Sequence, residues 1–242
     1  LEGELRASLA QERQVRAEQR DFVAMVSHEF RTPLAIISTS AQQLGRNLAA
    51  PVEKSLARCR NIREAAQRLL ALVDEYLTDD RMREAPAVLR LAQCDLRALL
   101  QDLAQEFAPG RIDWEVAPQA EGIFSDPGLL RIALRNLLAN ADRHAPTDAA
   151  VLVRTWVAGG CLFLEVANPG VPISVEDRGR LFQKYHRGPS ALGRPGAGLG
   201  LYLVRSIARR LGGDAELVSL ENEMLTRFHL RLPLFEVESV RS

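Results

Sequence analysis

The sequence of 242 residues has few cysteines, no surplus of either charge and no long apolar run. Its three cysteines, Cys59, Cys94 and Cys161, lie far apart and form no CxxC or other ligand spacing, which argues against disulfides and zinc and suits a reducing compartment. The 31 basic residues balance the 31 acidic ones, so net charge gives no reason to expect nucleic acid or anionic lipid as a partner. No apolar run approaches the roughly 18 residues that would span a bilayer.

What the sequence does contain is an ordinary share of hydrophobic residues, 47%, which is enough for a real core. The length fits one large domain or two modest ones. The sequence opens at Leu1 rather than at a methionine, inside a stretch that already has a helical pattern. We therefore expect a fragment with further protein upstream.

Residues 1–84 have the pattern of long helices, with a charged, solvated surface over residues 1–20. Ile37, Ala41 and Leu44 are spaced by 4 and 3, and after an expected turn near 47–51 a second apolar stripe alternates spacings of 3 and 4. That second stripe consists of Val52, Ser55, Cys59, Ile62, Ala66, Leu69, Val73 and Tyr76. Such spacing is the 3.5-residue repeat of a coiled-coil seam, so the pattern predicts an antiparallel helical hairpin. Two hairpins would bury the thin seam in a four-helix bundle, which predicts a homodimer. The alternative is a hairpin that packs on its own second domain.

Residues 85–242 mix helices and strands without regular βαβ alternation, which predicts a sheet covered by helices on one face. Asp95 is placed to cap one helix, and Asp126 followed by proline begins another that extends to 143. A glycine-rich stretch over 188–200 leads into a helix that stops at Gly212 and Gly213. Alternating or apolar runs predict strands at 112–116, 151–157, 161–167 and 227–232.

Two stretches carry residues suited to phosphate chemistry. On helix 126–143, Asn136, Asn140 and Arg143 fall at i, i+4 and i+7 on one stripe, where amide oxygens could hold Mg²⁺ and an arginine could meet phosphate. Simple surface polarity explains these residues equally well. In "GRPGAGLGL", three glycines stand directly before a helix and would let backbone N–H groups approach an anion. This is neither a dinucleotide fingerprint nor a Walker loop, because no strand runs into it and the Gly-Lys-Ser/Thr ending is absent.

Five segments in order, "SHEFRTPL", "LRNLLANADRH", "VANPGVPI", "LFQKYHRG" and "GAGLGL", resemble the H, N, G1, F and G2 boxes of two-component sensor histidine kinases. The resemblance runs from about residue 15 to 233. It implies a dimerisation and histidine-phosphotransfer domain at 1–84, followed at 85–242 by an ATP-binding domain with a Bergerat-type α/β sandwich. It also implies a protein-histidine kinase that passes its phosphoryl group to an aspartate of a response regulator receiver domain, with phosphatase activity towards that regulator.

By the same resemblance, His28 is the phosphoacceptor. An unperturbed imidazole, with a pKa of about 6.5, is mostly neutral near pH 7 and offers a nucleophilic nitrogen. The apolar positions expected to face the seam, and so to leave His28 outward, are Phe22, Val26 and Phe30. Glu29 matches the residue that accepts the proton, and Thr32, one turn on, matches the residue that places water for dephosphorylation. Pro33 cannot donate to the carbonyl of Glu29, so we expect the helix to loosen or bend there.

The resemblance also assigns the residues that bind ATP and Mg²⁺. They are Asn136, Asn140, Arg143, His144, Asn168, Gly170, Arg187, Gly196, Gly198, Leu199 and Gly200. Asn140 would be the Mg²⁺ ligand, the glycines would flank the triphosphate, and Arg187 would reach the γ-phosphate. Phe182 and Tyr185 would pack the base of a lid over residues 186–197.

The sequence departs from the family pattern where the base should bind. The G1 box commonly reads D-x-G-x-G, but here the aligned residues are Asn168, Gly170 and Pro172. An asparagine oxygen can accept a hydrogen bond from the adenine amine if its NH₂ is turned away, but without charge assistance. The last glycine box is also eroded, since "NEMLTRF" lacks glycine. Weaker or altered ATP binding is therefore expected.

Two other functions stay open on the sequence. One is a weakly ATP-binding signalling scaffold or a phosphatase-dominant module. The other is an ATPase of the gyrase or Hsp90 type, against which "SHEFRTPL" on a coiled-coil hairpin weighs heavily. By family resemblance, we expect the cytoplasmic portion of a bacterial inner-membrane receptor, which would reach the membrane only through an upstream sensor portion.

Overall fold

The computed structural model describes residues 27, 29–46, 51–83, 89–188, 198–219 and 223–234, with the backbone alone at 68, 71 and 74–83. These residues belong to two compact units, and the division along the chain falls between Thr78 and Asp79. Within the described residues, no helix is both long enough and apolar enough to cross a membrane.

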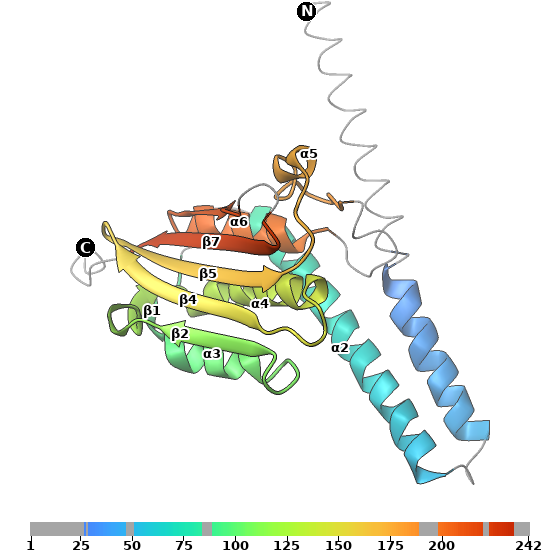
Figure 1. The fold of residues 1–242 in the computed structure, drawn as a ribbon. Helices are drawn as coiled ribbons and strands as arrows, with labels where there is room; N and C mark the ends of the chain where they lie inside the picture. Colours follow the sequence, from blue (N-terminus) through green and yellow to red (C-terminus); the bar gives the residue numbers. More distant parts are fainter. Residues whose placement is uncertain are drawn as a thin grey trace, which may run out of the picture. The chain divides into compact units, whose positions relative to one another are not determined.

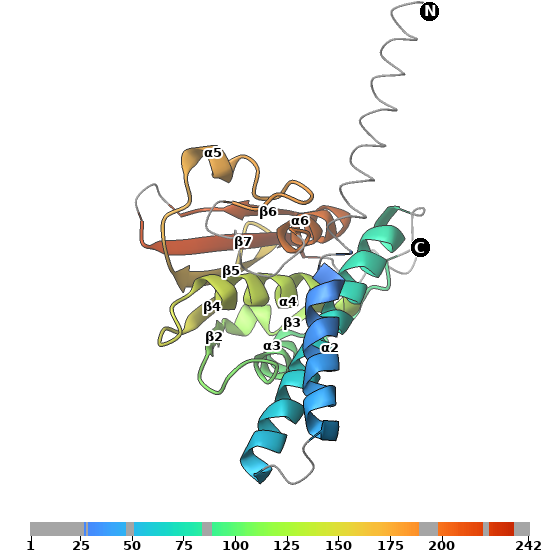
Figure 2. The ribbon, with the colours of Figure 1, turned by 90° about the vertical axis from the view of Figure 1, so that its right-hand side faces the viewer.

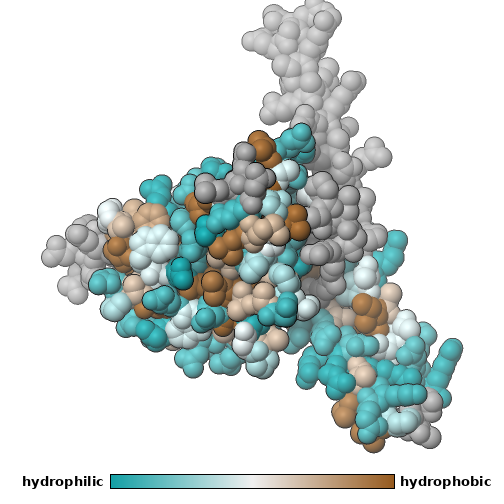
Figure 3. Space-filling model, in the orientation of Figure 1, coloured by the Kyte–Doolittle hydropathy of each residue, from teal (hydrophilic) through white to brown (hydrophobic). Residues whose placement is uncertain are grey.

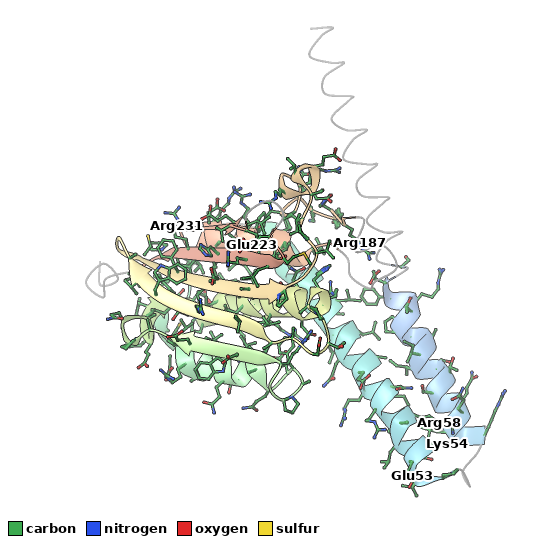
Figure 4. The ribbon with its side chains drawn as sticks, in the orientation of Figure 1. Glu53, Lys54, Arg58, Arg187, Glu223 and Arg231 are labelled. Atoms are coloured by element: carbon green, nitrogen blue, oxygen red, sulfur yellow. The ribbon has the colours of Figure 1, made fainter. Side chains whose placement is uncertain are left out.

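The first unit is an antiparallel helical hairpin, as the sequence predicts. A helix over residues 29–46 lies beside α2 (Val52–Arg83) in both ribbon views (Figures 1 and 2). Arg58, labelled on α2 in Figure 4, donates from Nη1 to the backbone carbonyl of Gln43 on the first helix, at 3.2 Å. The first helix is unbroken from 29 to 46, so Pro33 does not interrupt it.

The residues of α2, both those of the predicted stripe and apolar ones outside it, form two rows. One row is buried or half-buried and consists of Ser55, Ile62, Ala65, Leu69 and Leu72. The other row is exposed: Val52 is 68% exposed, Leu56 52%, Leu70 64% and Val73 37%. Cys59, which the sequence places on the seam, is also exposed. Figure 3 shows apolar side chains of this kind on the surface of the hairpin, at the lower right. The predicted stripe therefore contains both half-buried residues and exposed ones, and apolar side chains lie on two faces of α2.

The second unit is built on a five-stranded sheet in the order β2-β4-β5-β7-β6. Its strands are β2 (Ile112–Val116), β4 (Val151–Ala158), β5 (Cys161–Pro169), β7 (Leu225–Pro233) and β6 (Asp214–Leu217). β2 pairs parallel with β4, and the other pairings are antiparallel. A separate antiparallel pair, β1 (Ala92–Asp95) with β3 (Gly122–Ser125), and a 3₁₀ turn at Pro118–Ala120 complete the strand region.

Helices α3 (Leu96–Ala104), α4 (Pro127–His144) and α6 (Gly200–Arg210) cover one face of the sheet, while α5 (Val175–Arg178) is a single turn (Figures 1 and 2). The two predicted caps are present: Asp95 accepts from the N–H of Ala98 at 2.9 Å, and Asp126 from that of Leu129 at 3.1 Å. Each such cap stabilises its helix by about 1 kcal/mol.

The core lies between this sheet and α4 and α6. Buried leucines of α4 pack with the inward residues of β5 and β7, which alternate as the sequence predicts. The inward positions of β7 are Phe228, Leu230 and Leu232. The predicted helical hairpin followed by an α/β sandwich is confirmed.

Candidate nucleotide-binding site

Helix α4 presents polar side chains beside its buried face. Leu130, Leu134 and Leu137 are fully buried, which fixes the rotation of the helix about its axis. Asn136 and Asn140 are consequently half-buried at the edge of the core. Asn136 donates from Nδ2 to the carbonyl of Ile132 four residues earlier, at 2.9 Å, and its Oδ1 takes no part in that bond. The side chain of Asn140 makes no hydrogen bond within the described part of the chain, so its oxygen is available to a ligand.

The end of α4 is held by a residue that the sequence did not single out. Arg111, only 9% exposed, donates from Nε to the carboxylate of Asp142 at 2.6 Å and from Nη2 to the carbonyl of Asp142 at 2.8 Å. Nη1 donates to the carbonyls of Pro146, at 2.5 Å, and of Ala149. One guanidinium thus satisfies carbonyls of the last turn of α4 and of the loop that follows. It fixes the part of α4 that carries Arg143, which is itself exposed.

The start of α6 lies against α4. Gly198 has φ +68°, and a Cβ there would be 2.8 Å from the carbonyl oxygen of His186, so only glycine fits. A Cβ on Gly200 would lie 3.0 Å from Oδ1 of Asn136. Leu199 is the N-cap residue, and its side chain gives no capping hydrogen bond to the first backbone N–H groups of α6. Such a helix end favours an anion such as phosphate. Gly196 lies outside the described residues.

A buried acceptor that has no partner among the described residues lies at the end of β5. Asn168 is 1% exposed and pairs in register with Thr226 of β7. Its Nδ2 donates to the carbonyl of Pro169 at 3.0 Å, whereas its Oδ1 is buried without a hydrogen-bond partner among the described residues. Leaving a buried acceptor unpaired costs about 1–3 kcal/mol, and a ligand that brings a donor removes that cost. Because Nδ2 is engaged by the carbonyl of Pro169, Oδ1 is the atom of this amide that is left to accept from a donor.

Gly170 connects this acceptor to α4. A Cβ on Gly170 would lie 3.4 Å from Nδ2 of Asn168 and 3.4 Å from the carbonyl oxygen of His144, the last residue of α4. Asn136, beside the start of α6, and His144 are eight positions apart on α4, or about 12 Å at 1.5 Å per residue. An extended nucleoside triphosphate bridges a distance of this size. The site therefore offers an amine acceptor at one end and a helix N-terminus at the other.

The segment after α5 contributes cations. A cavity of about 450 Å³ is lined by Arg180, Lys184 and Arg187 together with Asp177 and neighbouring residues. Figure 4 labels Arg187 on this segment. His186 is nearly buried, and its Nε2 lies 3.4 Å from a carboxylate oxygen of Asp177 without the alignment of a hydrogen bond. Three cations against one carboxylate make this cavity suited to an anion.

In the first unit, the two residues predicted to act beside the phosphoacceptor differ in exposure. Glu29 is 6% exposed, while Thr32 is exposed on the same helix. His28 lies outside the described residues, as do Phe22 and Val26; Phe30 is half-buried. A buried glutamate keeps a fixed position, and an exposed threonine is accessible to a partner protein.

The α/β sandwich and the site along α4 define a nucleotide-binding domain of the kind shared by several ATPases. Residues 125–236 match the family described as "Histidine kinase-, DNA gyrase B-, and HSP90-like ATPase". Residues 18–85 match a second family, described as "His Kinase A (phospho-acceptor) domain". The chain belongs to the two-component sensor histidine kinases, and it comprises their catalytic portion.

Curated relatives agree with this assignment over most of the chain. The sensor histidine kinase GlrK of Escherichia coli (strain K12) is 26% identical over 223 residues, which are 90% of this chain and 47% of that protein. The sensor-like histidine kinase SenX3 of Mycobacterium tuberculosis is 30% identical, with 90% and 54% covered. The sensor protein CzcS of Cupriavidus metallidurans is 32% identical, with 90% and 46% covered. The chain thus spans about half the length of these relatives.

Solved structures show the same fold. Full-length ShkA in complex with AMPPNP superposes with a TM-score of 0.62 at 27% identity, covering 87% of this chain and 45% of that one. The histidine kinase AdeS of Acinetobacter baumannii has a TM-score of 0.59 at 17% identity, covering 86% and 98%. The second family match also removes the gyrase-type or Hsp90-type ATPase as an explanation for the whole chain.

Proposed function

We propose that the chain binds ATP along α4 and transfers its terminal phosphoryl group to His28. The observation that carries the nucleotide assignment is the buried, unpartnered Oδ1 of Asn168, whose amide is fixed by the carbonyl of Pro169. An adenine amine supplies the missing donor. The triphosphate would then extend towards the N-terminus of α6, where Gly198 and Gly200 keep the backbone free of side chains.

In the transfer step, the neutral imidazole nitrogen of His28 forms a bond to the γ-phosphorus while the bond from that phosphorus to the β,γ-bridging oxygen breaks. ADP leaves with the electron pair of the broken bond. The other ring nitrogen gives its proton to Glu29, whose burial keeps the carboxylate in one place. The chemistry asks the protein mainly for positioning and charge neutralisation.

Several side chains would position the triphosphate. The oxygen of Asn140 fits Mg²⁺, because it is a hard neutral ligand with no other hydrogen bond in the described chain. The ion supplies charge neutralisation on the phosphates. Asn136, beside Gly200, orients the start of α6, and Arg143 and Arg187 bring positive charge from α4 and from the cavity segment.

We infer that the phosphoryl group then passes from His28 to an aspartate of a response regulator receiver domain. Phosphoimidazole is labile enough to donate to a carboxylate. The exposed hydroxyl of Thr32 stands one turn beyond His28 in sequence and would place a water for the reverse task, dephosphorylation of the regulator.

The second copy of the chain would cover the exposed row of α2. Leu56 and Leu70 are 52% and 64% exposed, and they lie on the side of α2 away from its buried row. Burial of such side chains between two hairpins yields about 1.5–3 kcal/mol for each one fully covered. Leu56→Glu combined with Leu70→Glu is expected to convert a dimer into a monomer in sedimentation velocity. A variant that still sediments as a dimer would place the interface elsewhere.

The matched relatives are about twice as long as this chain, and we propose that the rest of the receptor lies upstream. Those relatives carry names that describe sensors, and ATP is a cytoplasmic substrate. We therefore propose that this portion works on the cytoplasmic side of a bacterial inner membrane and receives its signal from an N-terminal sensor.

The test of the kinase assignment combines nucleotide binding with phosphoryl transfer. Wild type should take label from γ-labelled ATP, His28→Gln should bind ATP equally but take no label, and Asn140→Ala should lose label. Stable labelling of His28→Gln would refute the assignment. A dimeric wild type that binds ATP only at millimolar concentration and forms no phosphohistidine would instead favour the scaffold or phosphatase function.

A further inference from the structure

An arginine of α6 is held rigidly by an aspartate of β6. Arg205 donates from Nε and Nη2 to the two carboxylate oxygens of Asp214, at 2.8 and 2.9 Å. This bidentate arrangement fixes the plane of the guanidinium as well as its position. The arginine also holds the pKa of the Asp214 carboxyl well below its usual range. Arg209, one turn on, reaches the same carboxylate at 3.3 Å.

The fixed guanidinium lies over an aromatic ring of the segment after α5. The Cζ of Arg205 is 5.0 Å from the centroid of the Phe182 ring, within the range of a cation–π contact. Phe182 in turn meets the buried Phe228 edge to face, with centroids 6.1 Å apart. Phe182 is therefore held between the core of the sheet and a charge on α6.

A second contact joins the same two elements in the opposite sense. Lys184, on the segment, lies 5.3 Å from the ring centroid of Tyr202 on α6 and 5.3 Å from that of Tyr185. Tyr202 and Arg205 are three positions apart on α6, so they share one face of the helix. Each element thus gives a cation to a ring of the other. We call Phe182, Lys184, Tyr202 and Arg205 the reciprocal clasp.

Beyond the clasp, the segment leads directly to Arg187, one of the three cations that line the cavity. Tyr185 has φ 65°, an unusual value for a residue other than glycine, and its N–H donates to the carbonyl of Gly198 at 3.0 Å. Arg187 follows two residues later and lines the cavity. The clasp, the Tyr185 hydrogen bond and the start of α6 therefore form one continuous structure.

We propose that the reciprocal clasp positions Arg187 against the terminal phosphate of ATP, with Arg205 and Tyr202 as positioning residues that do not touch the nucleotide. This inference rests on the proposed function, because it assumes that the triphosphate lies at the start of α6. ADP lacks the terminal phosphate, so it gains nothing from Arg187. Loss of the clasp should weaken ATP binding while ADP binding stays near its wild-type strength.

The experiment measures the dissociation constants of ATP and ADP for the full chain by titration calorimetry. Arg205→Met removes the cation over Phe182 and should lower the preference for ATP over ADP by about fivefold, the scale of one partly desolvated cation–π contact. Tyr202→Leu should do the same, and Tyr202→Phe, which keeps the ring, should restore most of the preference. Arg209→Met is the matched control, because Arg209 shares the Asp214 partner, is 62% exposed and makes no ring contact among those found in the described chain. It should leave the preference unchanged.

The outcomes separate the inference from the function on which it rests. Equal weakening of ATP and ADP by Arg205→Met and Tyr202→Leu would mean that the clasp only supports the fold, and would overturn the inference. So would an unchanged preference in both variants when Arg187→Ala lowers it. Failure of the wild type to bind ATP, or to prefer it in a way that depends on Arg187, would instead overturn the proposed site. If Arg205→Met fails to fold, Tyr202→Leu beside Tyr202→Phe decides the matter.

Discussion

Replacement of Asn168 by leucine tests whether the site recognises the adenine base of ATP through a hydrogen bond to Asn168. Leucine has the same branched shape as asparagine, so it fits the 1% exposed position at the end of β5 without a polar atom. It removes the unpartnered Oδ1, whose burial costs the nucleotide-free protein about 1–3 kcal/mol. It also removes the hydrogen bond to the carbonyl of Pro169, which offsets part of that gain. Without nucleotide, Asn168→Leu should be at least as stable as wild type.

Although Asn168→Leu should not lower the stability of the protein, it should weaken the binding of ATP. A neutral hydrogen bond between the adenine amine and Oδ1 contributes about 1 kcal/mol, or about fivefold in the dissociation constant. Purine riboside triphosphate lacks that amine. Wild type should therefore bind ATP about fivefold more tightly than this analogue, while Asn168→Leu should bind the two alike and both weakly.

Titration calorimetry with the two nucleotides, together with thermal unfolding without nucleotide, provides the assay. Asn168→Asp is a useful companion, because a carboxylate acceptor should strengthen ATP binding several-fold by charge assistance. If wild type does not distinguish ATP from the analogue, or if Asn168→Leu retains a preference for ATP, the base does not meet Asn168. The nucleotide pose proposed along α4 would then be wrong.

Three further substitutions test residues that stabilise the structure around the site. Gly198→Ala should destabilise the second unit by about 1–3 kcal/mol, because φ is +68° and the new Cβ would overlap the backbone of Tyr185 and His186; an unchanged thermal midpoint would contradict this. Arg111→Met should cost about 3 kcal/mol in urea unfolding, because it leaves carbonyls and a carboxylate unpaired at the end of α4; a wild-type midpoint would show that water replaces it. Asp214→Asn should cost about 1 kcal/mol near pH 7, a value reduced for partial exposure, and this difference should begin to shrink below about pH 4 and vanish only in stronger acid. The depressed carboxyl pKa makes that contribution fully present above the unfolded pKa and lost as the pH falls through the folded pKa, so a gap that does not narrow at all as the pH falls below about 4 would refute the role of the ion pair with Arg205.

Local signals explain why much of the fold could be predicted. Asp95 and Asp126 begin their helices through hydrogen bonds to residues three positions on, and the alternation of β7 reflects one buried face. Strands β1, β3 and β6 have four residues each, too few for a pattern to stand out. On α2 the 3-and-4 spacing is the same for both rows, so it could not show which row faces the first helix.

The candidate site likewise contains residues that the sequence predicted and residues that it did not. The motifs indicated Asn136, Asn168, Gly198 and Gly200, and the structure brings the first beside Gly200 and shows why Asn168 has an acceptor to spare. Contacts across long sequence separations gave no signal. Arg111 meets carbonyls 31 to 38 residues away, although an arginine after a turn is usually solvated. The clasp of Arg205 on Phe182 likewise depends on tertiary packing.

The most direct measurement compares the label that the protein acquires from γ-labelled ATP with the label that it acquires from α-labelled ATP. With γ-labelled ATP, the wild-type chain should acquire a label that acid removes and alkali does not, and that maps to the peptide containing His28. With α-labelled ATP it should acquire none. Label that survives acid, or that appears in His28→Gln at wild-type levels, would contradict the transfer of the terminal phosphoryl group to this imidazole.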